Sequence, residues 1–271
     1  MNRLAGRVCL LTGSTGIAAA AAERFLAEGA SVFVTSRTEE HCRALAERLG
    51  SPGRPIGYLR ADLTDERDVA AAVRACVEAF GRIDGLFSVA GGSGRGFGDG
   101  PIHDMTAKAW DATVALNLRT QALVCREVVG RMRSQAPNDS GTRGSILLMG
   151  SVTATDPVPA FFGTHAYAAA KGAIAALMTS LAASYAPELI RVNVVAPSLT
   201  ATPMATRAAE DPAIRAFARR KQPLAGEFLD PIEVAHAAVY FLSDESRTVT
   251  GQLLKVDGGW SVVSASPEGR P

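Results

Sequence analysis

Two side chains suited to acid–base chemistry, Tyr167 and Lys171, lie four residues apart in the sequence. On a helix this spacing places the phenol and the ammonium group on one face. A free tyrosine has a pKa of about 10, and a nearby positive charge lowers that pKa because it favours the phenolate. The pair therefore predicts a tyrosine that donates a proton to a carbonyl oxygen or accepts one from an alcohol. A tyrosine packed beside a surface lysine, without a chemical role, is the alternative interpretation.

A serine at the end of an apolar run is the predicted partner of this pair. Ser151 directly follows the apolar stretch 146–150, which is typical of a buried strand. Ligands of open α/β sheets bind beyond the carboxyl ends of the strands. Ser151 is therefore predicted to lie where a substrate oxygen can be held.

A glycine-rich turn lies near the start of the chain, between an apolar run and an alanine-rich segment. It contains Gly13, Ser14, Thr15, Gly16 and Ile17. Glycines in a strand-to-helix turn let the backbone approach a pyrophosphate, and the helix N-terminus supplies positive potential. The turn indicates a nucleotide site, although two glycines also occur in ordinary turns.

The residues after the second predicted strand favour one nicotinamide cofactor over the other. A cofactor with a free ribose 2′-hydroxyl is usually met by an Asp or Glu about 20 residues after the glycine motif. Here Ser36 and Arg37 occupy this place, and the first carboxylate is that of Glu39. Because an arginine can neutralise a 2′-phosphate, NADP(H) is favoured and NAD(H) is the alternative. A solvated arginine at the start of a helix would look the same.

Short strands and helices alternate along the whole chain. This alternation is typical of βαβ units, which form a parallel sheet covered by helices on both faces. We therefore predict a Rossmann-type α/β fold, doubly wound around a seven-stranded parallel sheet, in a single domain that spans 1–271. The predicted strands cover 8–12, 31–36, 56–61, 83–89, 145–150, 191–196 and 253–256, and the predicted helices cover 18–28, 39–49, 65–80, 107–133 and 167–185. Two later helices are predicted to begin at Asp211-Pro212 and Asp230-Pro231, with Asp as the cap.

Three segments interrupt the alternation and are predicted to be surface loops. Segments 91–101 and 197–211 each follow a strand, so both should border the site, and 197–226 is predicted to form the lid over the substrate. Segment 134–144 leads into a strand, so it should lie at the opposite end. The tail 260–271 lies beyond the last motif, and it either covers a neighbouring subunit's site or is loose.

The composition excludes several classes of protein. Lys+Arg 28 against Asp+Glu 27 gives a formal net charge of +1, which argues against a nucleic-acid partner because such binding depends on many cationic contacts with phosphates. No apolar run approaches the length of a membrane span, and the start does not match a secretion signal, so no membrane partner is expected. The cysteines and histidines are dispersed, so no metal site is expected. The cysteines are predicted to be buried, reduced thiols of a cytoplasmic protein.

In their order and spacing, these residues resemble the short-chain dehydrogenase/reductase family, in particular the group of the 3-oxoacyl-carrier-protein reductases. The resemblance extends from Leu4 to Gly259. Besides the glycine turn it rests on Asp62-Leu63-Thr64-Asp65, Ala90-Gly91, Asn117, Ser151, Tyr167 with Lys171, the stretch 190–197, and Thr250-Gly251-Gln252 with Val256-Asp257-Gly258-Gly259. It implies an NADP(H)-dependent oxidoreductase that interconverts a ketone and a secondary alcohol of a small-molecule substrate.

The resemblance also implies a role for each matching residue. Tyr167 would be the acid or base, Lys171 would lower its pKa and bind the nicotinamide ribose, Ser151 would hold the substrate oxygen, and Asn117 would bind a water of a proton relay. The cofactor would be bound by Gly13, Ser14, Thr15, Gly16, Ile17, Ser36, Arg37, Asp62, Leu63, Ala90, Gly91, Pro197, Leu199 and Thr202, together with Tyr167 and Lys171. Members of the family pair through the helix of the tyrosine, so a homodimer or homotetramer is implied.

The sequence departs from the family pattern at several positions. The glycine turn is one residue short, Ala18 replaces the third glycine, and Ser88 replaces an asparagine.

The shortened turn is similar to that of enoyl reductases, which reduce a C=C bond, but those relatives separate the tyrosine and lysine by seven residues. A cofactor-binding sensor or scaffold without turnover is the second alternative. The complete set Asn117, Ser151, Tyr167 and Lys171 argues against it.

Some further side chains have two interpretations. Phe161 and Phe162 either form an apolar wall for the substrate or pack within their loop, and His165 lies either near the site or on the surface. The basic residues of the lid either attract an anionic substrate or form a solvated helix face. These residues are Arg215, Arg219, Arg220 and Lys221.

Overall fold

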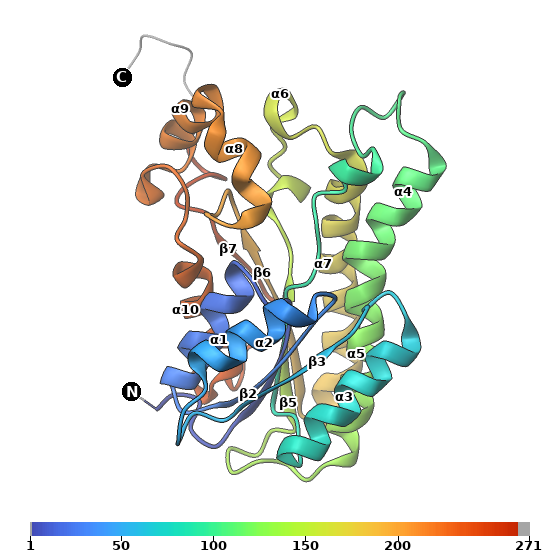
Figure 1. The fold of residues 1–271 in the computed structure, drawn as a ribbon, viewed down its shortest axis with the longest axis vertical. Helices are drawn as coiled ribbons and strands as arrows, with labels where there is room; N and C mark the ends of the chain where they lie inside the picture. The colour runs from blue at the N-terminus through green and yellow to red at the C-terminus, as the bar shows by residue number, and fades with distance from the viewer. Residues whose placement is uncertain (1, 265–271) are drawn as a thin grey trace.

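The computed structural model describes residues 2–264, and these form a doubly wound α/β domain (Figure 1). Seven parallel strands lie in the order β3-β2-β1-β4-β5-β6-β7. They are β1 (Val8–Thr12), β2 (Ser31–Ser36), β3 (Ile56–Arg60), β4 (Gly85–Ser88), β5 (Gly144–Met149), β6 (Ile190–Pro197) and β7 (Leu253–Val256). The sheet therefore has the predicted class and number of strands, with bounds close to those predicted.

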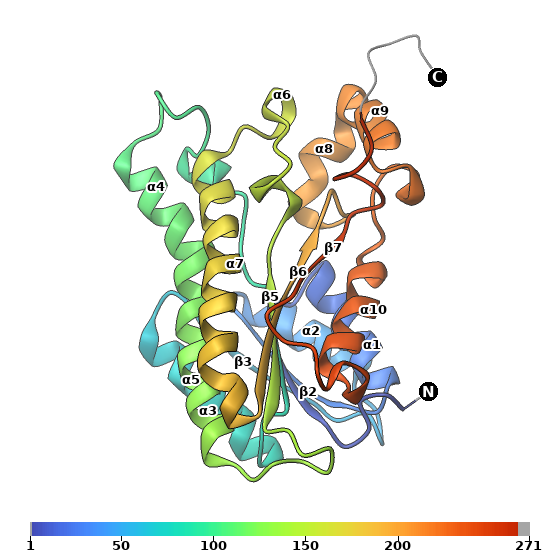
Figure 2. The ribbon, with the colours of Figure 1, turned by 180° about the vertical axis from the view of Figure 1, so that it is seen from behind.

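Helices cover both faces of the sheet, and each face has its own apolar core. One face carries α1 (Ile17–Ala27), α2 (Glu39–Leu49) and α10 (Pro231–Leu242), and the other carries α3 (Glu66–Phe80), α4 (Ala107–Val114), α5 (Thr120–Ser134) and α7 (His165–Tyr185), as the two views show (Figures 1 and 2). Phe25 and Leu242 belong to the first core, and Val128 and Ile174 belong to the second. Because both faces are buried, β1 and β5 consist mostly of apolar residues without alternation.

The helix predicted over 107–133 is wrong in one respect, because the structure interrupts it. Between α4 and α5 lies a π-helical segment, η2 (Ala115–Arg119), and Asn117 is at its centre. A π segment inserts an extra residue into the helix, and such segments are frequent at functional sites. No periodicity in the sequence indicated this insertion.

Short helices occupy the ends of the loops around the predicted site. They are η1 (Arg95–Phe97), η3 (Val152–Ala154), α6 (Pro159–Phe162), η5 (Pro203–Ala205), α8 (Thr206–Glu210), α9 (Pro212–Lys221) and η6 (Pro223–Ala225). Segment 197–211, predicted as a loop, therefore contains η5 and α8. The predicted caps are confirmed, since the carboxylates of Asp211 and Asp230 accept hydrogen bonds from the first N–H groups of α9 and α10.

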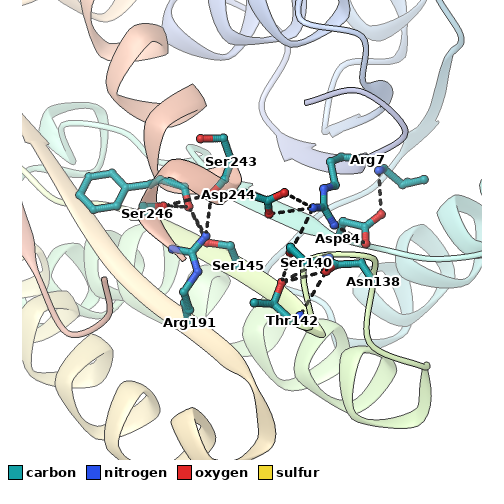
Figure 3. Close-up of polar contacts among 12 residues, drawn as sticks. Arg7, Asp84, Asn138, Ser140, Thr142, Ser145, Arg191, Ser243, Asp244 and Ser246 are labelled. Atoms are coloured by element: carbon teal, nitrogen blue, oxygen red, sulfur yellow. Dashed lines mark hydrogen bonds and ion pairs between the residues drawn. The ribbon is translucent and has the colours of Figure 1, made fainter. Parts of the chain in front are cut away.

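Segment 134–144 lies at the opposite end of the sheet, as predicted, and polar contacts fix it there (Figure 3). The Asn138 side chain accepts hydrogen bonds from the N–H and hydroxyl of Ser140. Arg7, just before β1, donates to the Ser140 hydroxyl at 3.2 Å and to the Asp244 carboxylate at 2.7 Å. Asp84, just before β4, accepts from the N–H of Val8 at 3.0 Å. These bonds join the amino ends of the strands, far from the loops of the predicted site.

The structure bears on two expectations from composition, one about the cysteines and one about a membrane-spanning segment. Cys9, Cys42, Cys76 and Cys125 are all buried and unpaired, as predicted, and burial raises the pKa of Cys76 and of Cys125 to about 12. By length and composition alone, the segment 165–188 would also pass as a membrane span. In the fold its first 21 residues are α7, whose inner face, including Ile174 and Met178, packs in the core beside β6.

Candidate active site

A pocket of about 410 Å³ lies beyond the carboxyl ends of β1, β4, β5 and β6. The turn after each of these strands forms part of the pocket wall. The wall residues are Gly13 after β1, Ala90 after β4, Ser151 after β5 and Ser198 after β6. The ribbon shows α6, α8 and α9 at this end of the molecule (Figures 1 and 2). The site therefore lies at the end of the sheet where ligands of α/β proteins bind.

The structure brings most of the predicted site residues together in this pocket. Its wall includes all four predicted catalytic residues, Asn117, Ser151, Tyr167 and Lys171, and the predicted cofactor residues Gly13, Thr15, Gly16, Ile17, Ala90, Gly91, Pro197, Leu199 and Thr202. Ser14, Ser36, Arg37, Asp62 and Leu63 lie outside this wall. The second group lies at or just after the carboxyl ends of β1, β2 and β3, which form the adjoining part of the sheet.

The shortened glycine turn presents an uncapped helix end to the pocket. Gly16, at the N-cap of α1, has a φ of 55° and makes no side-chain cap, so the first N–H groups of α1 have no side-chain partner. A Cβ on Gly16 would lie 2.9 Å from the Thr202 side chain, and a Cβ on Gly13 would lie 3.2 Å from the Ala18 methyl group. Only glycine fits this cradle. The donor set and the helix dipole suit the phosphates of a dinucleotide.

Hydrogen bonds hold the turns after β1, β2 and β4 together. The Thr12 hydroxyl accepts from the N–H of Ala90 at 3.0 Å, and the Ser14 and Ser36 hydroxyls lie 2.8 Å apart. Arg37 is exposed, and its charge helps to lower the pKa of Asp62, although the main cause is the hydrogen bond from the N–H of Thr64. Asp62 and Arg37 are therefore neighbours on the side of the sheet expected for the adenine ribose.

Asn117 is completely buried and connects the π segment to the loop after β4. Its amide nitrogen donates to the Gly92 carbonyl at 2.8 Å and to the Thr113 carbonyl at 2.9 Å, while its oxygen accepts from the N–H of Gly92 at 3.2 Å. A Cβ on Gly91 would lie 2.7 Å from that oxygen. The side chain of Asn117 therefore fixes the shape of the pocket floor, and Gly91 is required by the close approach.

Lys171 projects from α7 into the core of the site. Its ammonium nitrogen donates to the Met149 carbonyl at 2.8 Å and lies 5.5 Å from the centre of the Tyr167 ring. Burial lowers the pKa of Lys171 to about 7, since a charged ammonium is poorly solvated there. At neutral pH this side chain is therefore close to the midpoint of its titration.

The prediction that Lys171 lowers the pKa of Tyr167 is wrong for this arrangement. The pKa of Tyr167 is raised, because burial of the phenol outweighs the opposing interaction with the Ser151 hydroxyl. Lys171 is itself desolvated and bonded to Met149, so its positive charge does not dominate at the phenol. Ser151 is oriented as the N-cap of η3, where it accepts from the N–H of Thr153 at 3.2 Å.

Several residues that shape the pocket had no signal in the sequence. Its wall also includes Arg95, Met204, Arg207 and Trp260. Asp99 is buried and accepts hydrogen bonds from the main-chain N–H groups of Ala166 and Tyr167. Arg95 and Asp99 lie in the predicted loop 91–101, and Met204 and Arg207 lie in the predicted lid 197–226, but no motif or periodicity singled out these side chains or Trp260.

The residues with two interpretations are now placed. Phe162 lines the pocket and packs on Trp260, whereas Phe161 packs on Phe217. His165 is exposed and does not line the pocket.

The basic run on α9 also lies outside the pocket wall. Arg215 and Arg219 pair with Glu227, and Lys221 donates a hydrogen bond to the Val263 carbonyl. Of the tail, Trp260 is buried, and residues 265–271 lie outside the described residues.

Comparisons with known proteins agree on one family. Residues 12–261 match the family model described as enoyl-(acyl carrier protein) reductase. Short-chain dehydrogenase reductase 5 of Arabidopsis thaliana is 36% identical over 97% of both chains, and the A-factor type gamma-butyrolactone 1'-reductase (1S-forming) of Streptomyces virginiae is 35% identical over 96% of this chain and 97% of its own. The crystal structure of levodione reductase superposes with a TM-score of 0.86 at 30% identity, covering 96% of this chain and 100% of that one.

Proposed function

The chain belongs to the short-chain dehydrogenase/reductase family of NAD(P)-dependent oxidoreductases, and we propose that it interconverts a ketone and a secondary alcohol with NADP(H). The observation that carries this proposal is the meeting of Ser151, Tyr167 and Lys171 in one pocket with the glycine turn. That pocket joins a proton donor, a hydroxyl for the substrate oxygen and a phosphate cradle.

Each proposed catalytic residue acts on the proton or the oxygen of the substrate. The bound nicotinamide supplies or accepts the hydride. The Tyr167 phenol is protonated at neutral pH, as an ordinary tyrosine is, and burial raises its pKa further, so it suits protonation of a carbonyl oxygen. The Ser151 hydroxyl hydrogen-bonds that oxygen, and Lys171 binds the nicotinamide ribose. The side-chain amide of Asn117 is occupied by Gly92 and Thr113. The side-chain bonds that its main-chain carbonyl accepts, from Thr120 and Gln121, are long at 3.5 and 3.4 Å, and this carbonyl is the group proposed to hold the relay water.

The proposed cofactor site extends from the nicotinamide to the adenine end. Pro197, Leu199 and Thr202 face the nicotinamide, and the turn 13–17 binds the pyrophosphate. Ala90, Gly91, Asp62 and Leu63 border the adenosine, and Ser36 and Arg37 bind the 2′-phosphate. Arg37 supports the choice of NADP(H), since it is exposed at the end of β2 and forms no ion pair with a carboxylate of residues 2–264.

A homodimer or homotetramer is proposed through the outer face of α7. Ala169, Gly172 and Ala176 are exposed along this face, where small side chains permit close approach of a second helix. Sedimentation velocity of the purified protein tests this assembly, and a monomer would contradict it.

A cytoplasmic location is proposed as well, because four buried free thiols suit a reducing compartment.

The reaction is tested by offering the enzyme NADPH or NADH with a panel of ketones and of α,β-unsaturated ketones. We expect oxidation of NADPH, formation of secondary alcohols and survival of the C=C bond in the unsaturated members, as seen by mass spectrometry and NMR. Saturated ketone products would instead favour the enoyl-type reaction. Binding of NADPH, measured by its fluorescence, without turnover of any member would favour a sensor or scaffold.

A further inference from the structure

The wall of the active-site pocket carries only positive charge. Among the described residues that line it, the ionisable side chains are Arg95, Tyr167, Lys171 and Arg207, and no Asp or Glu is present. Lys171 and Tyr167 belong to the proposed catalytic group. The proposed function gives the two arginines no role in carbonyl reduction or in binding NADP(H), so their presence in the wall needs another explanation.

Arg95 and Arg207 come from different loops and converge on one atom. Arg95 lies in η1, after β4, and Arg207 lies in α8, after β6. Both donate to the main-chain carbonyl oxygen of Phe161 in α6, after β5, at 3.2 and 3.0 Å. The three loops that surround the pocket are thus joined by two guanidinium groups bound to one oxygen.

This arrangement brings two like charges together without a carboxylate to separate them. The pKa of Arg95 is lowered by partial burial and by the positive charge of Arg207. Both side chains are exposed, and among residues 2–264 each one bonds the Phe161 carbonyl and no carboxylate. Asp99 acts on Arg95 through its charge, but its two oxygens already accept the N–H groups of Ala166 and Tyr167.

Both guanidinium groups keep donors for a ligand. A guanidinium has five N–H donors, and each of these uses one on Phe161. Guanidinium groups match the geometry of carboxylate, phosphate and sulfonate oxygens, often through two parallel bonds. An anion beside the two side chains would also remove the repulsion between them.

We propose that Arg95 and Arg207 form a subsite for an oxoanion of the substrate, so that the preferred substrate is an anionic ketone or its alcohol. This inference rests on the proposed function, because it assigns the substrate class of the same pocket. The wall also contains Val152, Met204 and Trp260, which suit an apolar chain between the carbonyl group and the anion. Carboxylate, phosphate and sulfonate share the required chemistry.

The competing explanation is a structural one, in which the arginines only fasten α6. A fastening role predicts that removing either arginine weakens binding of all substrates alike. An oxoanion subsite predicts that the loss is selective for charged substrates. The ratio of the kcat/KM for a charged substrate to that for its neutral counterpart therefore separates the two explanations.

The experiment uses the enzyme with NADPH and a series of oxo acids, in which the chain between ketone and carboxylate increases in length. Each acid is compared with its methyl ester and with the oxoalkyl phosphate and sulfonate of the same length. We expect kcat/KM for at least one class of anion to exceed that for the ester by about tenfold or more, the usual effect of a charge-assisted hydrogen bond. The class that benefits most identifies the anion.

Variants then assign the effect to the two side chains. In Arg95→Gln and Arg207→Gln, the ratio of kcat/KM for the anion to kcat/KM for its ester should fall toward one. The control is Arg220→Gln, which changes an exposed arginine of the lid outside the pocket wall and should leave this ratio unchanged. Esters that react as well as every anion in the unmodified enzyme overturn the proposal. A loss that is equal for acid and ester in the two variants also overturns it, since this is the result expected of a fastening role.

A binding measurement keeps this inference separate from the proposed function. The oxo acids and their esters are titrated into the Tyr167→Phe enzyme with bound NADPH, and the quenching of NADPH fluorescence is followed. Binding of an anion at least about tenfold tighter than its ester, and loss of this difference in Arg207→Gln, supports the subsite even if no compound is reduced. Absence of turnover then contradicts the proposed function alone. Equal binding of acid and ester overturns the subsite whether or not turnover is seen.

Discussion

The carboxylate of Asp99 accepts a hydrogen bond from the main-chain N–H of Tyr167 at 2.8 Å, across 68 residues of sequence. Its other oxygen accepts from the N–H of Ala166 at 3.1 Å. Asp99 thus satisfies the first turn of α7, whose N-cap residue, Thr164, makes no side-chain cap. The loop that carries Arg95 is thereby fixed to the helix that carries the proposed acid.

Replacement of Asp99 should therefore destabilise the fold near the site. We expect Asp99→Ala to lower the free energy of unfolding by about 1–2 kcal/mol, the usual cost of a lost helix cap. Urea denaturation followed by circular dichroism measures this change. Asp104→Ala, an exposed aspartate before α4, is the matched control and should have little effect. Equal stabilities of the two variants would show that the cap contributes nothing.

Lys171 should make the stability of the cofactor-free enzyme depend on pH. Its pKa is about 7 in the fold and about 10.4 in an unfolded chain, so between pH 7 and 9 the unfolded state binds more protons. The free energy of unfolding should therefore rise with pH in this window, by up to about 1.4 kcal/mol per pH unit from this side chain.

The variant Lys171→Met removes this contribution, because an apolar side chain carries no proton in either state. Its free energy of unfolding should depend less steeply on pH between 7 and 9 than that of the unmodified enzyme. Guanidinium denaturation at several pH values provides the comparison. Parallel pH profiles for the two proteins would mean that Lys171 stays charged in the fold.

Gly91 is predicted to tolerate no side chain. A Cβ there would lie 2.7 Å from the Asn117 oxygen, so Gly91→Ala must shift a buried and fully bonded amide, at a cost of about 1–3 kcal/mol. We expect a lower melting temperature and a lower kcat. Gly96→Ala, in the same loop, is the control, since its Cβ would meet nothing within 4 Å. A stable and active Gly91→Ala enzyme would argue that the loop relaxes freely.

Arg37 is predicted to decide between the two cofactors. Arg37→Asp should weaken the binding of NADPH by about tenfold or more and improve that of NADH, because a carboxylate repels the 2′-phosphate and accepts from a free 2′-hydroxyl. Fluorescence titration with both nucleotides measures the change. Arg43→Asp makes the same change of charge on the exposed face of α2 and should leave the ratio of the two affinities as it is. An unchanged ratio in Arg37→Asp would place the selectivity elsewhere.

Local patterns in the sequence predicted the framework of this molecule well. The apolar strands, the helix caps at Asp211 and Asp230 and the glycine turn depend on neighbouring residues, and the structure places them as expected. Ser151 follows β5 and Tyr167 lies in the first turn of α7, so both side chains reach the pocket beyond the carboxyl ends of the strands.

The remaining features depend on contacts between distant loops, which no local pattern contains. The cap of α7 by Asp99 and the convergence of Arg95 and Arg207 on Phe161 exist only once three loops are folded together. The direction of the pKa shift of Tyr167 depends on burial of the phenol, which spacing cannot reveal. The π segment at Asn117 likewise leaves no trace in the spacing of apolar residues.

The ketone reductase activity of Tyr167→Phe with NADPH tests whether Tyr167 is the acid. The variant keeps the ring and removes the proton donor, so we expect loss of turnover by about a hundredfold or more with nearly unchanged affinity for NADPH. Tyr185→Phe, at the far end of the same helix, is the matched control and should remain active. Retention of activity in Tyr167→Phe would contradict both the assignment of Tyr167 as the acid and the proposed ketone reduction.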